Sequence, residues 1–456
     1  MFSVLLDCVF PKLQDIIFMK RLLSHFFVLA ILGLHPLLLS SQEVAKIIPL
    51  TSSDTPSSKA LPEGMELVWN DEFNGASLDT IKWWNRYFSS LDWFNAVALK
   101  AFKNREIPKC DYEMSGSSII LKATDKIYPG SDRQISSIQT YNWDRNQDVV
   151  NNIVGGYYET RIRRDYGKKA DRINLAFWFD SPGPDLKYYL EQGSKLDGVE
   201  GIRPRGQVFE IDLCEYITTE VVLHGNVDAN GKFERNIGHY IHNGSFKGEW
   251  VVHSMLWSPA GLKFFIDGEL VHQWWDKHDI KSPNHAMNLF LGAYGLKGAT
   301  MEVDYVRCYQ WALEKDNLLP NPGFEYSDAL FPWEGTGLIE KAAARSGAHA
   351  LSVSPGAFVE QYLYLDHSSD FQLSFWSKGD GALNVTVEDL LPVKGTAETQ
   401  KKLVVKGGCA DYVQTKMMFG TLPEAAQNKR TVKVIFENKG SSAVVVDDVC
   451  IGVASN

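Results

Sequence analysis

The sequence is poor in the features that mark several large protein classes. It has 6 cysteines in 456 residues, and their spacing matches neither a disulfide-dense scaffold nor a metal-binding motif. Its formal net charge of -10 offers no basic surface for phosphates, which argues against nucleic acid as a partner. Long amphipathic helical patterns are also scarce. These absences leave an ordinary globular protein built mostly from strands.

Long apolar runs are missing except near the N-terminus. A basic Met19-Lys20-Arg21 precedes residues 22–41, which carry no charge and end in small residues. This layout is typical of a secretory signal, so we expect Met19 to be the true start and residues 1–41 to be removed. The mature protein is then secreted or periplasmic, with no membrane attachment. A membrane anchor is the alternative, which two histidines and a proline in the run disfavour.

Short alternating runs separated by turn residues dominate from residue 67 onward. The segments 117–123, 156–163, 262–267 and 301–307 read as strands, and Asp267-Gly268 reads as a hairpin turn. The length allows two or three domains. We expect an all-β protein with a polar linker at 42–62, an antiparallel β-sandwich (jelly roll) at 63–313, and a smaller β-sandwich at 317–456.

One strand-like segment, residues 209–216, holds three carboxylates. Alternation places Glu210 and Asp212 on one face, and a β-bulge at Leu213-Cys214 would bring Glu215 to the same face. Three crowded carboxylates repel one another, and they can supply two acids with separated pKa values, as retaining cleavage of a glycosidic bond requires. The alternative is a solvent-facing edge strand that carries acids against aggregation.

Five motifs in chain order resemble glycoside hydrolase family 16. They are Leu67-Val68-Trp69-Asn70-Asp71-Glu72-Phe73-Asn74-Gly75, Gly156-Tyr157-Tyr158-Glu159-Thr160-Arg161, Ala176-Phe177-Trp178, Glu210-Ile211-Asp212-Leu213-Cys214-Glu215 and Val303-Asp304-Tyr305-Val306-Arg307-Cys308-Tyr309. The resemblance implies a two-sheet jelly roll and endo-acting, retaining hydrolysis of a β-linked polysaccharide, without a catalytic cofactor. It implies that Glu210 is the nucleophile, Glu215 the general acid/base and Asp212 the helper between them.

Four aromatic or imidazole side chains are candidates for substrate contact. Trp178 is expected to stack on a sugar near the cleavage point, with a core position as the alternative. Trp93 and Trp143 lie in loop-like segments and are candidate sugar platforms, or else core or surface residues. His224 follows the acids on the adjacent strand, where it either touches substrate or is structural.

The substrate prediction rests on three features. Family members that cut β-1,3-glucans commonly carry glycine before the first glutamate, where this chain has Phe209. The long insertion at 181–207 is more similar to members that act on red-algal galactans. Basic residues gather at 161–172, joined by Arg203 and Arg205, and could contact sulfate or carboxylate groups. We therefore expect an agar, porphyran or carrageenan type of substrate. The alternatives are an endo-β-1,3-glucanase and a non-catalytic polysaccharide-binding protein.

The C-terminal segment resembles a jelly-roll carbohydrate-binding module. Its opening and closing motifs suggest a structural calcium ion near Glu325 and Asp448, since carboxylates suit that ion. Surface acids at paired strand ends are the alternative. The expected partner is the polysaccharide alone, and the expected state is a monomer.

Overall fold

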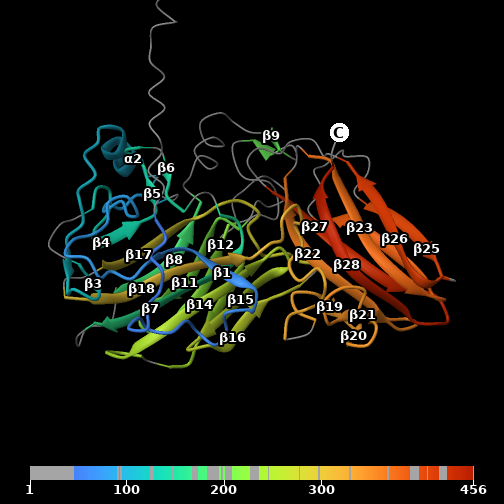
Figure 1. Ribbon diagram of the computed structural model, residues 1–456. Helices are drawn as coiled ribbons and strands as arrows, with labels where there is room; N and C mark the ends of the chain where they lie inside the picture. The colour runs from blue at the N-terminus through green and yellow to red at the C-terminus, as the bar shows by residue number, and fades with distance from the viewer. Residues whose placement is uncertain are drawn as a thin grey trace, which may run out of the picture. The chain divides into compact units, whose positions relative to one another are not determined.

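The computed structural model describes residues 46–454, with the exception of 90–91, 93–94, 124–127, 146, 151–152, 167–172, 182–194, 197–198, 201–207, 226–235, 245, 277, 296–297, 328–329, 367–368, 391–399, 408 and 421–428. The expected signal sequence, residues 1–41, therefore lies outside the described residues. Residues Ala45–Asn456 form one compact unit. Nearly all of its regular structure is antiparallel β-sheet, as the sequence predicted (Figure 1).

The first sandwich is built from an eight-stranded sheet and a six-stranded sheet. The eight-stranded sheet has the order β16-β15-β14-β7-β18-β3-β2, and β1 also pairs with β18. Its strands are β1 (Met65–Asp71), β2 (Tyr112–Met114), β3 (Ile119–Lys122), β7 (Gly156–Asp165), β14 (Trp250–Ser258), β15 (Gly261–Ile266), β16 (Glu269–Trp274) and β18 (Thr300–Trp311). The six-stranded sheet has the order β13-β12-β11-β8-β17-β4. Its strands are β4 (Gln134–Gln139), β8 (Asn174–Asp180), β11 (Glu210–Glu215), β12 (Glu220–His224), β13 (Gly238–Ile241) and β17 (Asn288–Gly295).

Smaller elements complete this half of the chain. They are the helix α2 (Ala96–Lys103) and the short strands β5 (Tyr141–Asn142), β6 (Gln147–Asp148), β9 (Lys195–Leu196) and β10 (Val199–Glu200). All four predicted strand segments and the hairpin are confirmed. The hairpin residues Asp267 and Gly268 both have positive φ, at 48° and 80°, as a two-residue turn between β15 and β16 requires.

Alternation along the strands divides core from surface. In β8, Leu175, Phe177 and Phe179 are at most 1% exposed and belong to the core between the two sheets. The intervening residues of β8 therefore project from the opposite face of the six-stranded sheet. This face carries the candidate site.

The second sandwich consists of two five-stranded sheets, with the orders β19-β22-β27-β24-β25 and β20-β21-β28-β23-β26. The strands are β19 (Glu334–Gly335), β20 (Leu338–Glu340), β21 (Ala350–Val353), β22 (Phe358–Leu365), β23 (Phe371–Gly379), β24 (Ala382–Asp389), β25 (Gln400–Lys406), β26 (Cys409–Phe419), β27 (Arg430–Asn438) and β28 (Val444–Val453). It has its own apolar core, which confirms the predicted smaller β-sandwich. The five cysteines of the described chain are all unpaired. No helix in the described part of the chain has both the length and the apolar character needed to cross a membrane.

Residues 46–62 are not the free linker that their polar composition suggested. The backbone of Ile48 exchanges two hydrogen bonds with the Asn70 amide, at 2.9 and 2.8 Å. The Ser58 amide donates to Glu159 at 3.0 Å, and the Thr55 hydroxyl donates to Asp304 at 3.0 Å. This segment, which we call the strap, binds the eight-stranded sheet. Composition indicated exposure, but it could not reveal the buried Glu159 and the partly buried Asp304, which accept hydrogen bonds from the strap.

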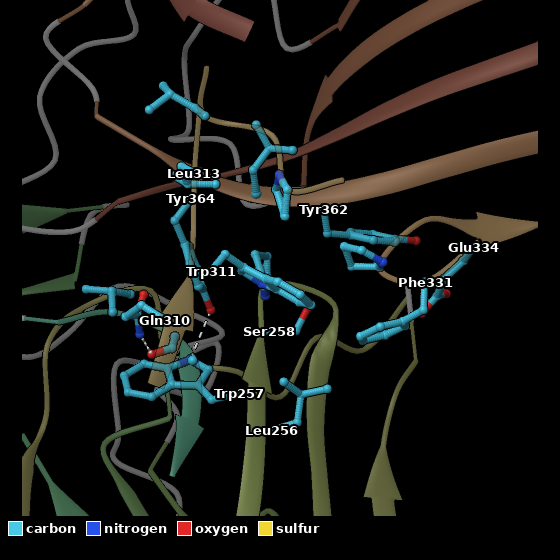
Figure 2. Close-up of a pocket in the computed structure, with 18 of the residues that line it drawn as sticks. Leu256, Trp257, Ser258, Gln310, Trp311, Leu313, Phe331, Glu334, Tyr362 and Tyr364 are labelled. Atoms are coloured by element: carbon cyan, nitrogen blue, oxygen red, sulfur yellow. Dashed lines mark hydrogen bonds between the residues drawn. The ribbon is translucent and has the colours of Figure 1, made fainter. Parts of the chain in front are cut away.

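The two sandwiches share a seam of polar and aromatic contacts. The Trp257 indole donates to the Tyr364 hydroxyl at 3.0 Å, and the Trp275 indole donates to Glu334 at 2.8 Å. Figure 2 shows the pocket at this seam, where aromatic rings lie beside aliphatic and polar side chains. The cavity has a volume of about 150 Å³. The contacts come from β14 and β22, among other segments, so the seam joins the two cores.

Candidate active site

The three acids lie on β11, and the predicted bulge brings them together. Asp212 pairs with Val222 of β12 and Glu215 with Glu220, so two residues of β11 stand opposite one of β12. Against β8 the shift falls between Asp212 and Cys214. This extra residue restores Glu215 to the face of Glu210 and Asp212, as the sequence predicted. The two bulge residues, Leu213 and Cys214, both belong to the core between the sheets.

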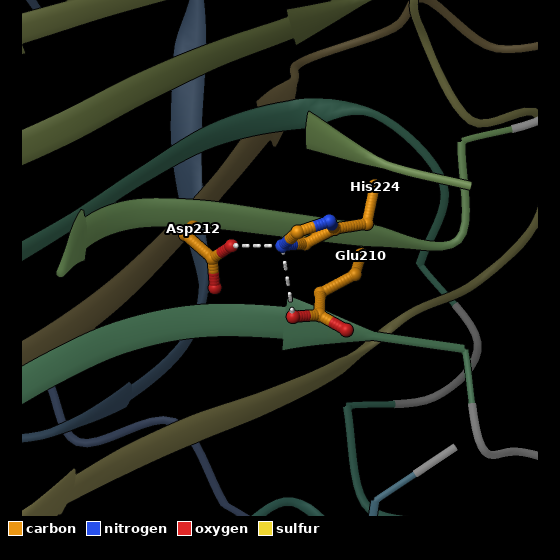
Figure 3. A group of neighbouring side chains, drawn as sticks. All are labelled: Glu210, Asp212 and His224. Atoms are coloured by element: carbon orange, nitrogen blue, oxygen red, sulfur yellow. Dashed lines mark ion pairs between the residues drawn. The ribbon is translucent and has the colours of Figure 1, made fainter. Parts of the chain in front are cut away.

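His224 lies directly across from Glu210 in the register of β11 and β12. Its Nε2 stands 3.7 Å from a Glu210 oxygen and 3.6 Å from an Asp212 oxygen (Figure 3). Its Nδ1 accepts a hydrogen bond from the Asn236 amide at 3.2 Å. In the neutral ring the proton must therefore sit on Nε2, where it faces both carboxylates. His224 is placed to orient the acids, in addition to any contact with substrate.

Burial and mutual repulsion shift two of the acids. The pKa of Asp212 is raised well above its ordinary value by burial, and then by the negative charges of Glu215 and Glu210. The pKa of Glu215 is also raised, mainly by burial, although a hydrogen bond from Asn174 at 2.5 Å opposes the shift. Both groups thus hold a proton to higher pH than a free carboxyl. This is the property that a general acid needs.

Asp180 is a fourth carboxylate that the sequence analysis missed. It is fully buried, and it pairs directly with Glu210 across β8 and β11, so both side chains project from the same face. One of its oxygens accepts the Ser181 amide at 2.7 Å, and its charge contributes to the raised pKa of Asp212. The period of two along β8 could have found it, because Trp178 and Asp180 differ by two positions.

Two of the three tryptophans predicted to contact substrate are buried. Trp178 pairs with Asp212 and shares its face, but it is only 6% exposed. Its ring stacks on Phe290 with centroids 4.1 Å apart, and its indole donates to Tyr294 at 2.9 Å. Trp143 is 7% exposed within the same aromatic cluster. These side chains pack in a core beside the acids rather than forming exposed sugar platforms. Trp93 lies outside the described residues.

The described residues of the predicted basic cluster do not face the acids. Arg161 and Arg163 lie on β7 in the eight-stranded sheet, where they pair with Asp304 and Glu302 of β18. Arg164 is buried and donates to the Tyr216 carbonyl at 2.6 Å and to the Thr219 hydroxyl, which fixes the turn after β11. The remaining basic residues of the cluster, at 168, 169, 172, 203 and 205, lie outside the described residues.

Three side chains of the candidate site could together hold a metal ion. Among the described residues, Glu210, Asp212 and His224 could each offer a ligand atom within 4.8 Å of one another. However, His224 Nδ1 already accepts the Asn236 amide, so a neutral ring carries its proton on Nε2, the atom that a metal would need.

The expected calcium site lies in the second sandwich. There Glu325 accepts the amides of Ala348 and His349 at 2.9 and 3.0 Å, and its other oxygen lies 3.1 Å from the His349 ring. Asp448 pairs with the Arg345 guanidinium and accepts the Ser346 hydroxyl. Protein donors thus reach all four oxygens. The calcium site at Glu325 and Asp448 therefore stays a prediction.

Comparisons with known proteins support the resemblance. The family model for glycosyl hydrolases family 16 matches residues 196–311, which contain the bulged strand. A glucan endo-1,3-beta-glucosidase A1 from Niallia circulans is 24% identical over 294 residues, or 57% of this chain and 40% of the relative. A beta-glucanase from Rhodothermus marinus is 24% identical over 274 residues, or 54% of this chain and 85% of the relative.

One solved structure is an endo-β-galactosidase from Clostridium perfringens that releases GlcNAcα1-4Gal. It is 18% identical and covers 67% of this chain and 73% of its own, with a TM-score of 0.39. A TM-score of this size supports no argument about function. The family model and the curated relatives, together with the bulged strand, support the assignment of this chain to glycoside hydrolase family 16.

Proposed function

We propose that this protein is a retaining endo-hydrolase of a β-linked polysaccharide. The observation that carries the proposal is the bulge in β11, which places Glu215 on the face of Glu210 and Asp212. A fold gains no stability from three crowded carboxylates, two of which have raised pKa values. Retaining glycosidases need this kind of neighbouring pair, in which one carboxyl attacks and the other holds a proton.

The proposed reaction uses the acids in fixed roles. The Glu210 carboxylate attacks the anomeric carbon, the bond from that carbon to the glycosidic oxygen breaks, and Glu215 gives its proton to the leaving oxygen. Glu215 then takes a proton from water, whose oxygen displaces Glu210 from the anomeric carbon. Because its pKa is raised, Asp212 can keep a proton and donate a hydrogen bond toward the Glu210 carboxylate. The Nε2 proton of His224 also faces Glu210 and stabilises its negative charge.

For the substrate we propose a red-algal galactan of the agar, porphyran or carrageenan type. The support is Phe209 in place of glycine and the long insertion at 181–207, most of which lies outside the described residues. Phe209 is 1% exposed, and a Cβ on Gly225 would lie 1.6 Å from its ring. Phe209 therefore acts on substrate choice indirectly: its ring packs against Gly225, just after β12, and does not touch the sugar itself.

An endo-β-1,3-glucanase is the second candidate. It is favoured by the curated relatives, which are described as a glucan endo-1,3-beta-glucosidase and a beta-glucanase. The same three acids would serve both substrates, so the choice depends on the walls of the site rather than on its chemistry.

The deciding experiment is a product assay with the chain from residue 42 onward. Agarose, porphyran, carrageenans, laminarin and mixed-linkage β-glucan are incubated in turn, and products are sized while the anomeric configuration is followed by NMR. We expect oligosaccharides from a galactan, released with retained configuration. Cleavage of laminarin alone would keep the mechanism and reject the galactan. Binding without any cleavage would favour a polysaccharide-binding protein.

Two further proposals concern the rest of the chain. The second sandwich holds the enzyme on its polymer, as expected of a carbohydrate-binding module, so its removal should weaken binding to insoluble substrate. The apolar run at 22–41 directs export, which N-terminal sequencing of the mature protein would test.

A further inference from the structure

A second pocket lies away from the three acids and is lined by cations and indole rings. It is a cavity of about 200 Å³ between α2 and the segments around residues 84 and 143. Its volume corresponds to about seven water molecules, which is room for one sugar ring. Its lining includes Arg86, Lys103 and Arg105 together with Trp84 and Trp143, and a single acid, Asp144.

The cations of this pocket are not paired with acids among the described residues. None of Arg86, Lys103 and Arg105 has an ion-pair partner within the described part of the chain. Arg86 donates one hydrogen bond to the Ile107 carbonyl, which leaves most of its donors available. The acid is engaged by the Trp84 indole, which donates to Asp144 at 2.9 Å. Three cations against one acid give the pocket a net positive charge.

Part of this charge has an ordinary cause. Lys103 and Arg105 lie at the C-terminus of α2, where the helix dipole favours cations. That effect does not account for Arg86, which comes from a different segment, or for the two indoles.

The backbone at Arg105 is also costly. Arg105 has φ of +59°, in the position after a helix end that usually holds glycine. Its amide bonds to the Phe102 carbonyl, and the next amide bonds to the Ala101 carbonyl, as a helix-ending motif requires. An arginine placed where glycine would be easier points to a use for its side chain.

The pocket is connected to the acids by the register of the six-stranded sheet. Trp84 bridges to Gln139 of β4, which pairs with Phe290 of β17. Phe290 pairs with Trp178 of β8, and Trp178 pairs with Asp212. Directly paired residues project from the same face, so Trp84 and Asp212 share a face. Four strand spacings separate them, which is roughly 19 Å, or a few sugar units along a chain laid across the strands.

We propose that this pocket, which we call the cationic pocket, binds an anionic group on a sugar of the bound polysaccharide. The group is a sulfate ester or a carboxylate, which guanidinium groups bind through paired charge-assisted hydrogen bonds. The largely buried indoles of Trp84 and Trp143 form part of the wall of the pocket. The role in substrate choice rests on the proposed function, whereas binding of the anion itself does not.

Binding is measured with the full chain carrying Glu210→Gln, so that no ligand is cleaved. Galactose 6-sulfate, galacturonate and galactose are titrated while tryptophan fluorescence and heat are recorded, and sulfated and neutral galactan oligosaccharides follow. We expect at least one anionic sugar to bind and galactose to bind at least tenfold more weakly. Comparison of sulfate with carboxylate identifies the preferred group. Equal binding of galactose and both anionic sugars, or no binding of either anion, would overturn the proposal.

Three variants and one control locate the binding. Arg86→Gln, Lys103→Gln and Arg105→Gly should each weaken anion binding by about tenfold. Arg105→Gly relieves the backbone and should keep or raise the Tm, so its loss of binding cannot come from misfolding. Lys100→Gln makes the same charge change on an exposed position of α2 and should leave binding within twofold. Unchanged anion binding in all three variants would place the anion elsewhere and contradict the proposal.

The proposed function is tested separately by cleavage of polysaccharides with the wild-type chain. Failure of every cleavage assay with anion binding intact would reject the hydrolase and keep the cationic pocket. Cleavage with no anion binding would do the reverse.

Discussion

At the scale of single residues, the two glutamates define the expected chemistry. Both project from the face opposite the core, so replacing either one should leave the fold intact. We expect Glu210→Gln and Glu215→Gln to lower turnover by roughly 10²–10⁴-fold, because each removes one half of the proposed exchange. Kinetics and thermal unfolding of each variant provide the measurement. Glu302→Gln, the same change in the eight-stranded sheet, is the control, and full activity in either active-site variant would contradict the roles.

The Asp212 carboxyl should lower the stability of the folded protein at neutral pH while it aids hydrolysis. Its pKa is raised in the folded protein, so the native state holds its proton more tightly than the unfolded chain does. The contribution of the Asp212 carboxyl to the free energy of unfolding is fully present below the ordinary carboxyl pKa. It is lost as pH rises through the pKa of Asp212 in the folded protein. We therefore expect Asp212→Asn to raise the Tm at pH 7 more than at pH 4, and to slow hydrolysis less than the glutamate variants. A lower Tm than wild type at pH 7 would contradict this account.

Asn174 sets the pH range in which Glu215 remains an acid. Its amide donates to the Glu215 carboxylate at 2.5 Å, and this bond lowers the pKa of Glu215. Removing it in Asn174→Ala should raise that pKa, so Glu215 keeps its proton to higher pH. We expect the basic limb of kcat/KM to move to higher pH. Because Asn174 also accepts the Tyr216 amide, circular dichroism should first show an unchanged fold. A limb that moves to lower pH would refute the prediction.

At the scale of elements, the strap decides the stability of the eight-stranded sheet. Beneath it lies Arg307, which is fully buried and pairs with Glu72 at 2.7 Å and with Glu159 at 3.5 Å. The Ser58 amide completes the set by donating to Glu159. Burial raises the pKa of Glu159, so the carboxylate depends on these donors to stay ionised.

We expect a chain that begins at residue 62 to be less stable by about 2–5 kcal/mol than one that begins at residue 46. The reason is that Glu159 and Asp304 lose hydrogen-bond donors from the strap. The buried group formed by Arg307, Glu72 and Glu159 is then incompletely paired. Denaturant unfolding of the two truncations measures the difference. Equal stability would show that the strap binds without stabilising the sheet.

At the scale of the whole molecule, the seam should make the two sandwiches unfold together. Tyr364 of the second sandwich accepts from the Trp257 indole of the first, and it donates to the Pro283 carbonyl at 2.7 Å. Asn284 exchanges two hydrogen bonds with the backbone of Lys429, at 2.8 and 2.7 Å. These partners are lost if either half is removed.

We expect calorimetry of the full chain to show one transition, and a chain ending at residue 316 to melt at lower temperature because the seam aromatics become exposed. Tyr364→Phe should reproduce a small part of the loss, about 1 kcal/mol, which is a shift of roughly 1 °C when the two sandwiches melt as one unit. Two separate transitions in the full chain, the first unchanged by truncation, would contradict the coupling.

The sequence by itself determined the features that depend on local alternation. It predicted the four strand segments, the hairpin at Asp267-Gly268 and both sandwiches, because side-chain period and turn residues act over a few positions. It also predicted the bulge in β11. Two glutamates five positions apart cannot share a face of a regular strand, so placing them together requires one extra residue.

Only the tertiary structure decided which side chains meet across strands. Asp180 and His224 join Glu210 from neighbouring strands, and pairing register cannot be read along a single strand. Trp178 shares the face of the acids yet is buried under an aromatic cluster gathered from distant segments. The same limit applies to the arginines of β7, whose partners lie on β18. It also applies to the cationic pocket, where Arg86 meets Lys103 and Arg105 from the end of α2. Local pattern fixes the face on which a side chain lies, whereas long-range pairing fixes the groups that surround it.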